Sequence, residues 1–182
     1  MLGKALAEAF QENLSSAELP NGRMYYNIAQ KVIVPMLENN YTMISDNAVA
    51  IQESLNQAAG IGIKGQVADF NTEKATGIVQ RVADELNFDD IKWILDNPVI
   101  NFSQSIVDDT IKKNAEFHSG AGLTARITRT AEAKACKWCR NLAGSYTYPD
   151  VPEDIWKRHE NDRCVILYTP KKGAKTEIHT FS

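Results

Sequence analysis

Apolar residues recur at helical spacing through most of the first 118 residues. Within 42–59, Ile44, Ala48, Ile51 and Leu55 follow the 3.6-residue period, which predicts an amphipathic helix. The same period predicts further helices at about 3–16, 24–39, 71–86, 88–95 and 99–117. Because no alternating pattern of useful length occurs here, we expect no strand in this part of the chain.

Helix boundaries are marked by proline, glycine and charge. Pro35 falls inside the apolar pattern of 24–39, so we expect a kink or a break there. Gly60 stands where a glycine would end the helix at 42–59. His118 ends the long helix, where the helix dipole favours a cation, and we expect no ligand role for it.

The pattern changes after Gly122. Residues 124–130 alternate and are rich in β-branched side chains, which predicts a strand. Further short strands are predicted at 146–148 and 164–168, and one helical turn at 152–156. The predicted fold class is therefore mainly α: a helical region at 1–122, then a small zinc-finger-like α+β module at 123–170 and a polar tail at 171–182.

Charge changes sign near the same place. Residues 1–123 contain 9 basic and 16 acidic side chains, a net charge of −7, whereas residues 124–182 contain 11 and 7, a net charge of +4. The stretch Ser119-Gly120-Ala121-Gly122 lies at this change. It is a candidate module boundary.

Composition excludes several classes of protein. With 43% hydrophobic and 24% charged residues, the chain can bury a core and is not disordered by composition. A net charge of −3 excludes a globally basic nucleic-acid-binding protein. No apolar run of about 18 residues predicts a membrane span. The first residues lack a secretory signal pattern, so we expect a cytosolic setting with reduced thiols.

The three cysteines gather near the C-terminal end. Cys136 and Cys139 form a C-x2-C pair, and His159 and Cys164 follow. Two thiolates on one tight turn, joined by an imidazole and a third thiolate, make a tetrahedral site whose soft donors favour Zn²⁺. The spacing predicts a structural zinc site, with a redox pair or simply buried cysteines as the alternatives.

Basic side chains also concentrate in the C-terminal module, with aromatic residues between them. This pattern is typical of a nucleic-acid or partner surface, although a solvated face over a small aromatic core is the simpler interpretation. The candidate contacts are Arg126, Arg129, Lys137, Arg140, Lys157, Arg158 and Arg163.

The segment from Cys136 to about Gly173 resembles the C-terminal module of phage Mu protein F-like head-morphogenesis proteins, the minor head or minor capsid proteins of tailed phages. The family shows C-x2-C, then L-x-G-x-Y, then R-H-x2-C-x-C. The matching residues are Cys136, Cys139, Leu142, Gly144, Tyr146, Arg158, His159, Cys164 and Tyr168.

The chain departs from that pattern at one position, because Asp162 stands where the family has the first cysteine of C-x-C. Asp162 is therefore an alternative zinc ligand to Cys164, and a carboxylate would hold the metal less tightly. A site that has lost its metal is the third alternative. The set Cys136, Cys139, His159 and Cys164 is our first choice.

The resemblance implies a virion protein that acts in head assembly, without catalysis. Its partners would be phage portal or capsid proteins, and it would act in the virion or the bacterial cytoplasm. Contact with DNA through the basic face and a homo-oligomer are both open. Two alternatives remain: a repurposed phage protein that inhibits a host or defence factor, and a metal-dependent nuclease. The nuclease is less favoured, because the module has one histidine and no visible catalytic arrangement.

Overall fold

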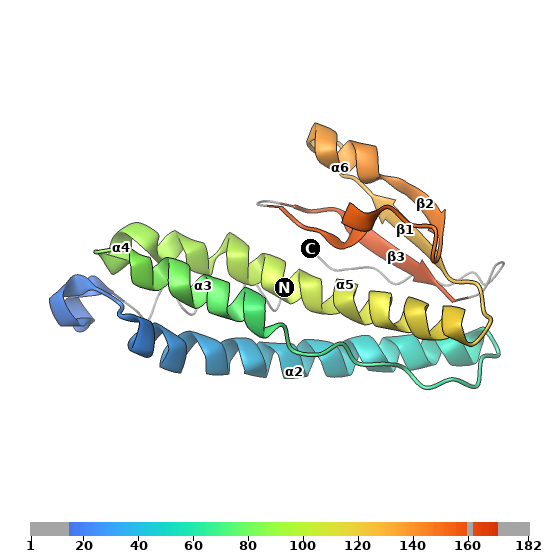
Figure 1. Cartoon of the computed structure of the whole chain (residues 1–182), viewed down its shortest axis with the longest axis horizontal. Coiled ribbons are helices and arrows are strands. Elements are labelled where there is room, and N and C mark those ends of the chain that lie inside the picture. The colour runs from blue at the N-terminus through green and yellow to red at the C-terminus, as the bar shows by residue number, and fades with distance from the viewer. Residues whose placement is uncertain (1–14, 160–161, 171–182) are drawn as a thin grey trace. The chain divides into compact units, whose positions relative to one another are not determined.

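The computed structural model describes residues 15–159 and 162–170. These residues form helices and one three-stranded antiparallel sheet towards the C-terminal end (Figure 1). The predicted fold class, mainly α with a small α+β part, is confirmed. The tail 171–182 and almost all of the predicted helix at 3–16 lie outside the described residues. None of the described helices is long and apolar enough to cross a membrane.

The described chain forms two compact units. The first contains the residues up to Met43 and Asp69–Gln104, and the second contains Ile44–Ala68 and the residues from Ser105 onward. Helices α2 (Tyr26–Ala58) and α5 (Asn97–Gly120) each run from the first unit into the second. The division between the units therefore does not coincide with the boundary predicted near residue 122.

The first unit is helical. Besides the first parts of α2 and α5, it contains η1 (Ser16–Glu18), η2 (Pro20–Gly22), α3 (Thr72–Asp84), α4 (Phe88–Ile91) and η3 (Lys92–Leu95). Its core is formed by buried apolar side chains of α2, α3, α4, η3 and α5 and of the segment before α2. They include Met24, Ile33, Leu37, Val79, Val82, Phe88, Ile94, Leu95 and Val99. Asn71 caps α3 by accepting the Lys74 amide.

Helix α2 is continuous through Pro35, so no break occurs there, and the helices predicted separately at 24–39 and 42–59 are one helix. Pro35 and Lys31 are both exposed. The Lys31 carbonyl, which cannot accept a hydrogen bond from Pro35, therefore belongs to the exposed side of the helix, where water can satisfy it. Ile33 and Leu37 on the opposite side are fully buried and hold the helix together across the proline.

The second unit contains the sheet. Its strands are β1 (Arg126–Thr130), β2 (Gly144–Thr147) and β3 (Val165–Thr169), in the order β2-β1-β3, with α6 (Lys137–Leu142) between β1 and β2 and η4 (Glu153–Trp156) before β3. The strand predictions hold to within two residues. Gly60 has φ +69° and ends α2 as expected.

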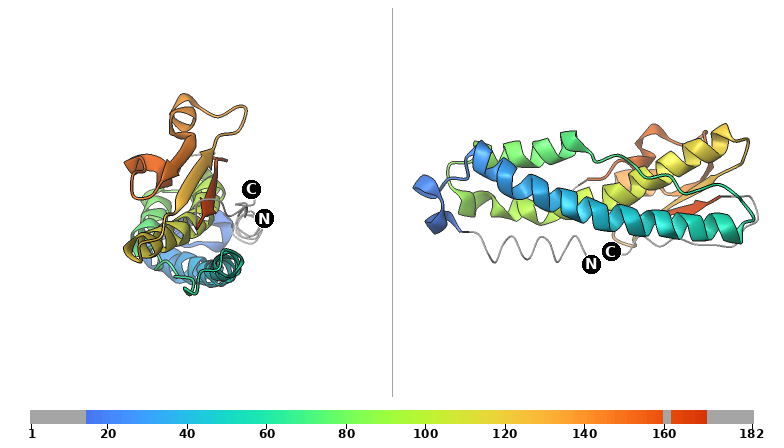
Figure 2. Two further views of the ribbon diagram at one scale, coloured as in Figure 1. Left: turned by 90° about the vertical axis from the view of Figure 1, so that its right-hand side faces the viewer. Right: turned by 90° about the horizontal axis from the view of Figure 1, so that it is seen from below.

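One face of the sheet lies against the second parts of α2 and α5 (Figure 2). On this face Ile127 pairs with Tyr168, and Arg129 with Ile166. The apolar cluster beneath it consists of Leu55, Ile111, Ala115, Ala125, Ile127, Ile155, Ile166 and Tyr168. Arg129 thus stands on an inward-facing strand position where the alternation calls for an apolar side chain.

Candidate metal centre

The turn before α6 holds the C-x2-C pair. Cys136 is the N-cap of α6, and its sulfur accepts the Cys139 amide N–H at 3.4 Å. A residue at the N-cap and another three positions later share one side of the first helical turn. Both sulfurs therefore face the same space, with the Cys139 side chain buried and that of Cys136 exposed.

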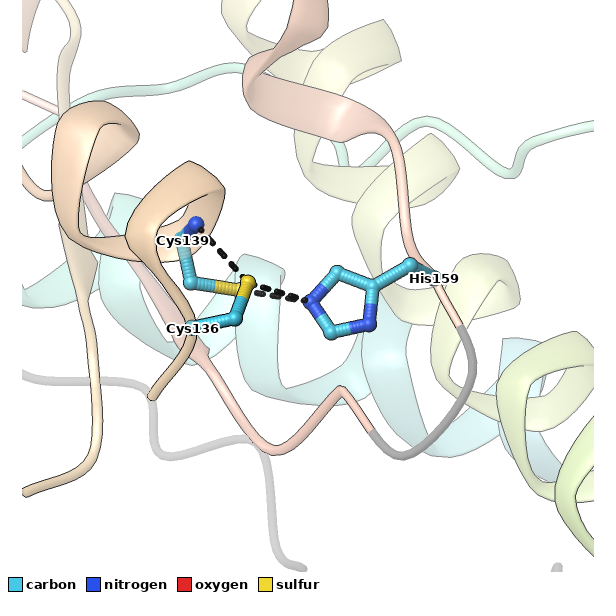
Figure 3. A group of neighbouring side chains, drawn as sticks. All are labelled: Cys136, Cys139 and His159. Carbon is cyan, nitrogen blue, oxygen red and sulfur yellow. Dashed lines mark hydrogen bonds between the residues drawn. The ribbon is translucent and has the colours of Figure 1, made fainter. Parts of the chain in front are cut away.

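His159 brings an imidazole to the two sulfurs. It lies after η4, and its Nε2 is 2.9 Å from the Cys139 sulfur and 3.4 Å from the Cys136 sulfur (Figure 3). Trp138 from α6 contacts the His159 ring edge-on, with the ring centroids 5.4 Å apart. The indole limits the orientation of the imidazole, so that its nitrogen stays aimed at the sulfurs.

These three donor atoms lie within 4.8 Å of one another. Zn–S and Zn–N bonds of usual length at tetrahedral angles separate a sulfur from a nitrogen by about 3.6 Å. The two observed sulfur-to-nitrogen distances need only a small opening to reach that value. All three cysteines are free thiols, so no disulfide occupies the donors. The cluster of Cys136, Cys139 and His159 can therefore bind a metal ion.

Cys164 lies beside the same cluster. Cys139, Asp162 and Cys164 form a second donor group whose atoms also lie within 4.8 Å of one another, and all three residues are buried. The Cys139 sulfur belongs to both groups. The structure thus places every predicted ligand in a group that contains the Cys139 sulfur.

Burial and nearby dipoles give the three thiols different pKa values. The amide of Cys139 and the neighbouring groups lower the pKa of the Cys136 thiol. Burial raises the pKa of Cys139 to about 12 and also raises the pKa of Cys164. Without a metal, Cys139 and Cys164 are therefore protonated at neutral pH, and a bound cation must displace their protons.

Asp162 is fully buried in an ion pair. Its Oδ2 accepts the Arg129 Nη2 at 2.7 Å, and its Oδ1 accepts the Cys164 amide at 2.8 Å. Burial alone would raise the pKa of Asp162, but the Cys164 amide and the guanidinium groups of Arg158 and Arg129 outweigh burial and lower it. The carboxylate is therefore charged in the folded chain.

Arg158 forms a second buried ion pair. Its Nε and Nη2 bond both oxygens of Asp108 on α5, at 2.6 and 2.9 Å, and its Nη1 bonds the Cys164 carbonyl at 2.7 Å. Such a two-pronged contact fixes orientation as well as charge. The sequence did not predict this pair, because Arg158 lies fifty positions after Asp108.

These ion pairs correct part of the predicted basic surface. Arg129 and Arg158 do not face outward, because each neutralises a buried carboxylate. The other candidate contacts are exposed, namely Arg126, Lys137, Arg140, Lys157 and Arg163. Two of them have local partners: Lys157 pairs with Asp154 at 2.6 Å, and Arg140 bonds the Ala135 carbonyl.

His118 differs from its prediction. It is fully buried, and its Nδ1 lies beside the Tyr168 hydroxyl. Burial lowers the pKa of His118, so the ring is neutral and is not the expected helix-end cation. Nothing in the sequence near residue 118 signalled a tyrosine fifty positions away.

Comparison of the chain with models of protein families, with curated proteins and with solved structures gives no significant match.

Proposed function

We propose that the chain is a non-catalytic, zinc-stabilised protein that acts in building a phage head. The observation that carries the zinc part is the convergence of Cys136, Cys139 and His159, with Cys164 against Cys139. Thiolates and an imidazole are the donors that Zn²⁺ prefers over Mg²⁺ or Ca²⁺. Four protein ligands would leave no open position for water, which is the condition for a structural ion.

The same cluster supports the head-assembly part. The residues of the phage-family resemblance that carry chemistry, Cys136, Cys139 and His159, are the ones that meet in space. Leu142 and Tyr146 of the same motif also meet, because the Tyr146 hydroxyl bonds the Leu142 carbonyl at 3.2 Å. A motif whose members contact one another is more specific than the same letters scattered over a surface. We take portal or capsid proteins as its partners and the virion as its location.

The exposed basic side chains are the candidate contacts for those partners or for DNA. Lys137 and Arg140 project from α6, and Arg163 directly precedes Cys164. A metal that fixes α6 and the segment ending at Cys164 would also fix these charges in space. This gives the ion a functional consequence without a catalytic role.

The zinc part is tested by elemental analysis of protein purified without added metal. We expect about one zinc per chain in the wild type and background zinc in Cys136→Ser. Asp154→Asn, in an exposed pair, is the matched control and should keep its zinc. A wild-type chain without zinc that also fails to take it up would contradict the proposal.

The head part is tested by co-expression with the portal and major capsid proteins of the phage that encodes the chain. We expect the wild-type chain to sediment with assembled heads and Cys136→Ser to be depleted from them. Asp154→Asn again serves as the control. A chain that binds zinc yet never associates with portal or capsid would overturn the head role and leave the zinc site standing.

A further inference from the structure

Asp162 lies where two roles compete. Its carboxylate belongs to a donor group with Cys139 and Cys164, so distance alone allows it to be a metal ligand. Its side chain is also 0% exposed and pairs with a guanidinium that is itself 0% exposed. The contacts of both partners decide between the two roles.

Both oxygens of Asp162 already have partners. Oδ2 accepts from Arg129 at 2.7 Å, and Oδ1 accepts from the Cys164 amide at 2.8 Å. The second bond joins the carboxylate to the backbone of a cysteine whose sulfur lies near Cys139. Asp162 thus orients the residue that carries the competing ligand.

Arg129 connects Asp162 to the other side of the site. Its Nη1 donates to the Ile155 carbonyl and, at 2.9 Å, to the Lys157 carbonyl, two residues before His159. Its guanidinium also lies over the Trp138 ring, 5.2 Å from the centroid. One buried cation therefore holds the backbone before His159, the indole that packs on His159, and the carboxylate beside Cys164.

Moving the carboxylate to a metal would break this arrangement. A metal bound by Oδ2 would displace Arg129, which would then keep a buried positive charge without that anion, and a metal bound by Oδ1 would displace the Cys164 amide; both changes are unfavourable in a dry interior. When Cys164 becomes a ligand, its thiol gives up its own contact with the Asp162 carboxylate, but the amide bond to Asp162 and the carbonyl bond to Arg158 stay in place, because neither involves the sulfur.

We infer that Asp162 is a positioning residue and not a ligand: with Arg129 it fixes the backbone on both sides of the site, so that the metal is held by Cys136, Cys139, His159 and Cys164. This inference rests on the proposed zinc site and specifies its donor set. Groups of this kind, which touch the ligands and not the metal, commonly change metal affinity ten- to a hundredfold.

The test uses Co²⁺ as a spectroscopic probe of the full chain, with Asp162→Asn, Cys164→Ser and the control Asp154→Asn. The intensity of sulfur-to-cobalt charge transfer reports the number of thiolates. We expect Cys164→Ser to lose one thiolate's share of that intensity. We expect Asp162→Asn to keep the wild-type spectrum and to bind Co²⁺ about ten- to a hundredfold more weakly, at a temperature where circular dichroism shows unchanged helix content. Asp154→Asn should match the wild type in both.

The opposite pattern overturns the inference: an altered spectrum in Asp162→Asn with an unaltered one in Cys164→Ser makes Asp162 the ligand. Full affinity in Asp162→Asn removes the positioning role. If the Asp162 variant does not fold, zinc X-ray absorption of the wild type decides the matter, with three sulfurs and one nitrogen expected and two sulfurs contradicting the inference. A wild-type chain that binds neither ion would overturn the proposed site itself, and that result is recognisable before any variant is made.

Discussion

The two compact units bury different kinds of side chain. The first unit is held by apolar residues on long helical segments, such as Ile33 and Leu37 of α2 and Val79 of α3. Near the Cys/His cluster the second unit buries charges as well, in the pairs Arg129–Asp162 and Arg158–Asp108. Its strands have four or five residues and α6 has six.

This difference indicates that the two regions are stabilised in different ways. Burying an apolar side chain stabilises a fold by about 1.5–3 kcal/mol, so long helices with continuous stripes can be stable through packing alone. Buried ion pairs add little net stability but specify geometry, because an unpaired partner is very costly. The region around the cysteines therefore has defined geometry and a small apolar core, a combination in which a metal ion contributes most.

The largest expected effect comes from removing a sulfur shared by both donor groups. Cys139→Ser should reduce zinc from about one per chain to background, and the sheet region should lose its cooperative unfolding transition, because structural zinc contributes about 10–16 kcal/mol in small zinc modules. Elemental analysis and near-ultraviolet circular dichroism measure the two effects. Retention of zinc by this variant would mean that the donor set is wrong.

The next effect comes from leaving one buried charge unpaired. Arg158→Met should lower the free energy of unfolding by about 3–5 kcal/mol, because Asp108 would remain buried without its cation. Urea denaturation followed by circular dichroism measures this change. The neighbouring control Lys157→Met removes an exposed pair and should have no measurable effect. Equal effects of the two substitutions would show that burial does not distinguish the pairs.

A smaller effect is expected in the apolar unit. Ile33→Val should lower the free energy of unfolding by about 0.5–1.5 kcal/mol, because it removes one methyl group from a fully buried position. Zinc content should stay at the wild-type value. Loss of zinc in this variant would contradict the distinction between a packed region and a metal-dependent one.

The smallest effect is a dependence on pH from His118. Burial lowers the pKa of His118, so below its ordinary value of about 6.5 the unfolded chain binds the proton more readily than the folded chain. This contribution to stability is complete above that pH and is lost as the pH falls towards the folded pKa. His118→Gln should weaken the dependence when both proteins are unfolded with zinc supplied. An unchanged pH dependence of stability would mean that the proton responsible binds to a group other than His118.

Local patterns in the sequence predicted the elements well. Periodicity located α3, α5 and the two parts of α2, the β-branched run located β1, and the C-x2-C spacing identified the pair that meets His159, whereas α6 was not predicted. These signals succeed because they depend on neighbours within one turn or one strand. The helix through Pro35 was missed because the sequence did not show that Lys31 and Pro35 both face solvent.

Long-range pairs could not be predicted. Arg129 looked like a surface cation among others, and only its partner Asp162, thirty-three positions later, explains its burial. The contacts Arg158–Asp108 and His118–Tyr168 each span fifty positions. A single sequence contains no local signal for such pairs, so they had to come from the structure.

Hydrogen exchange of the wild-type chain, with zinc supplied and then with a chelator, tests the central claim most directly. We expect the chelator to remove protection from amides of β1, α6 and β3, whereas amides of α3 keep theirs. Equal protection in both regions under both conditions would contradict a metal-dependent site in this chain.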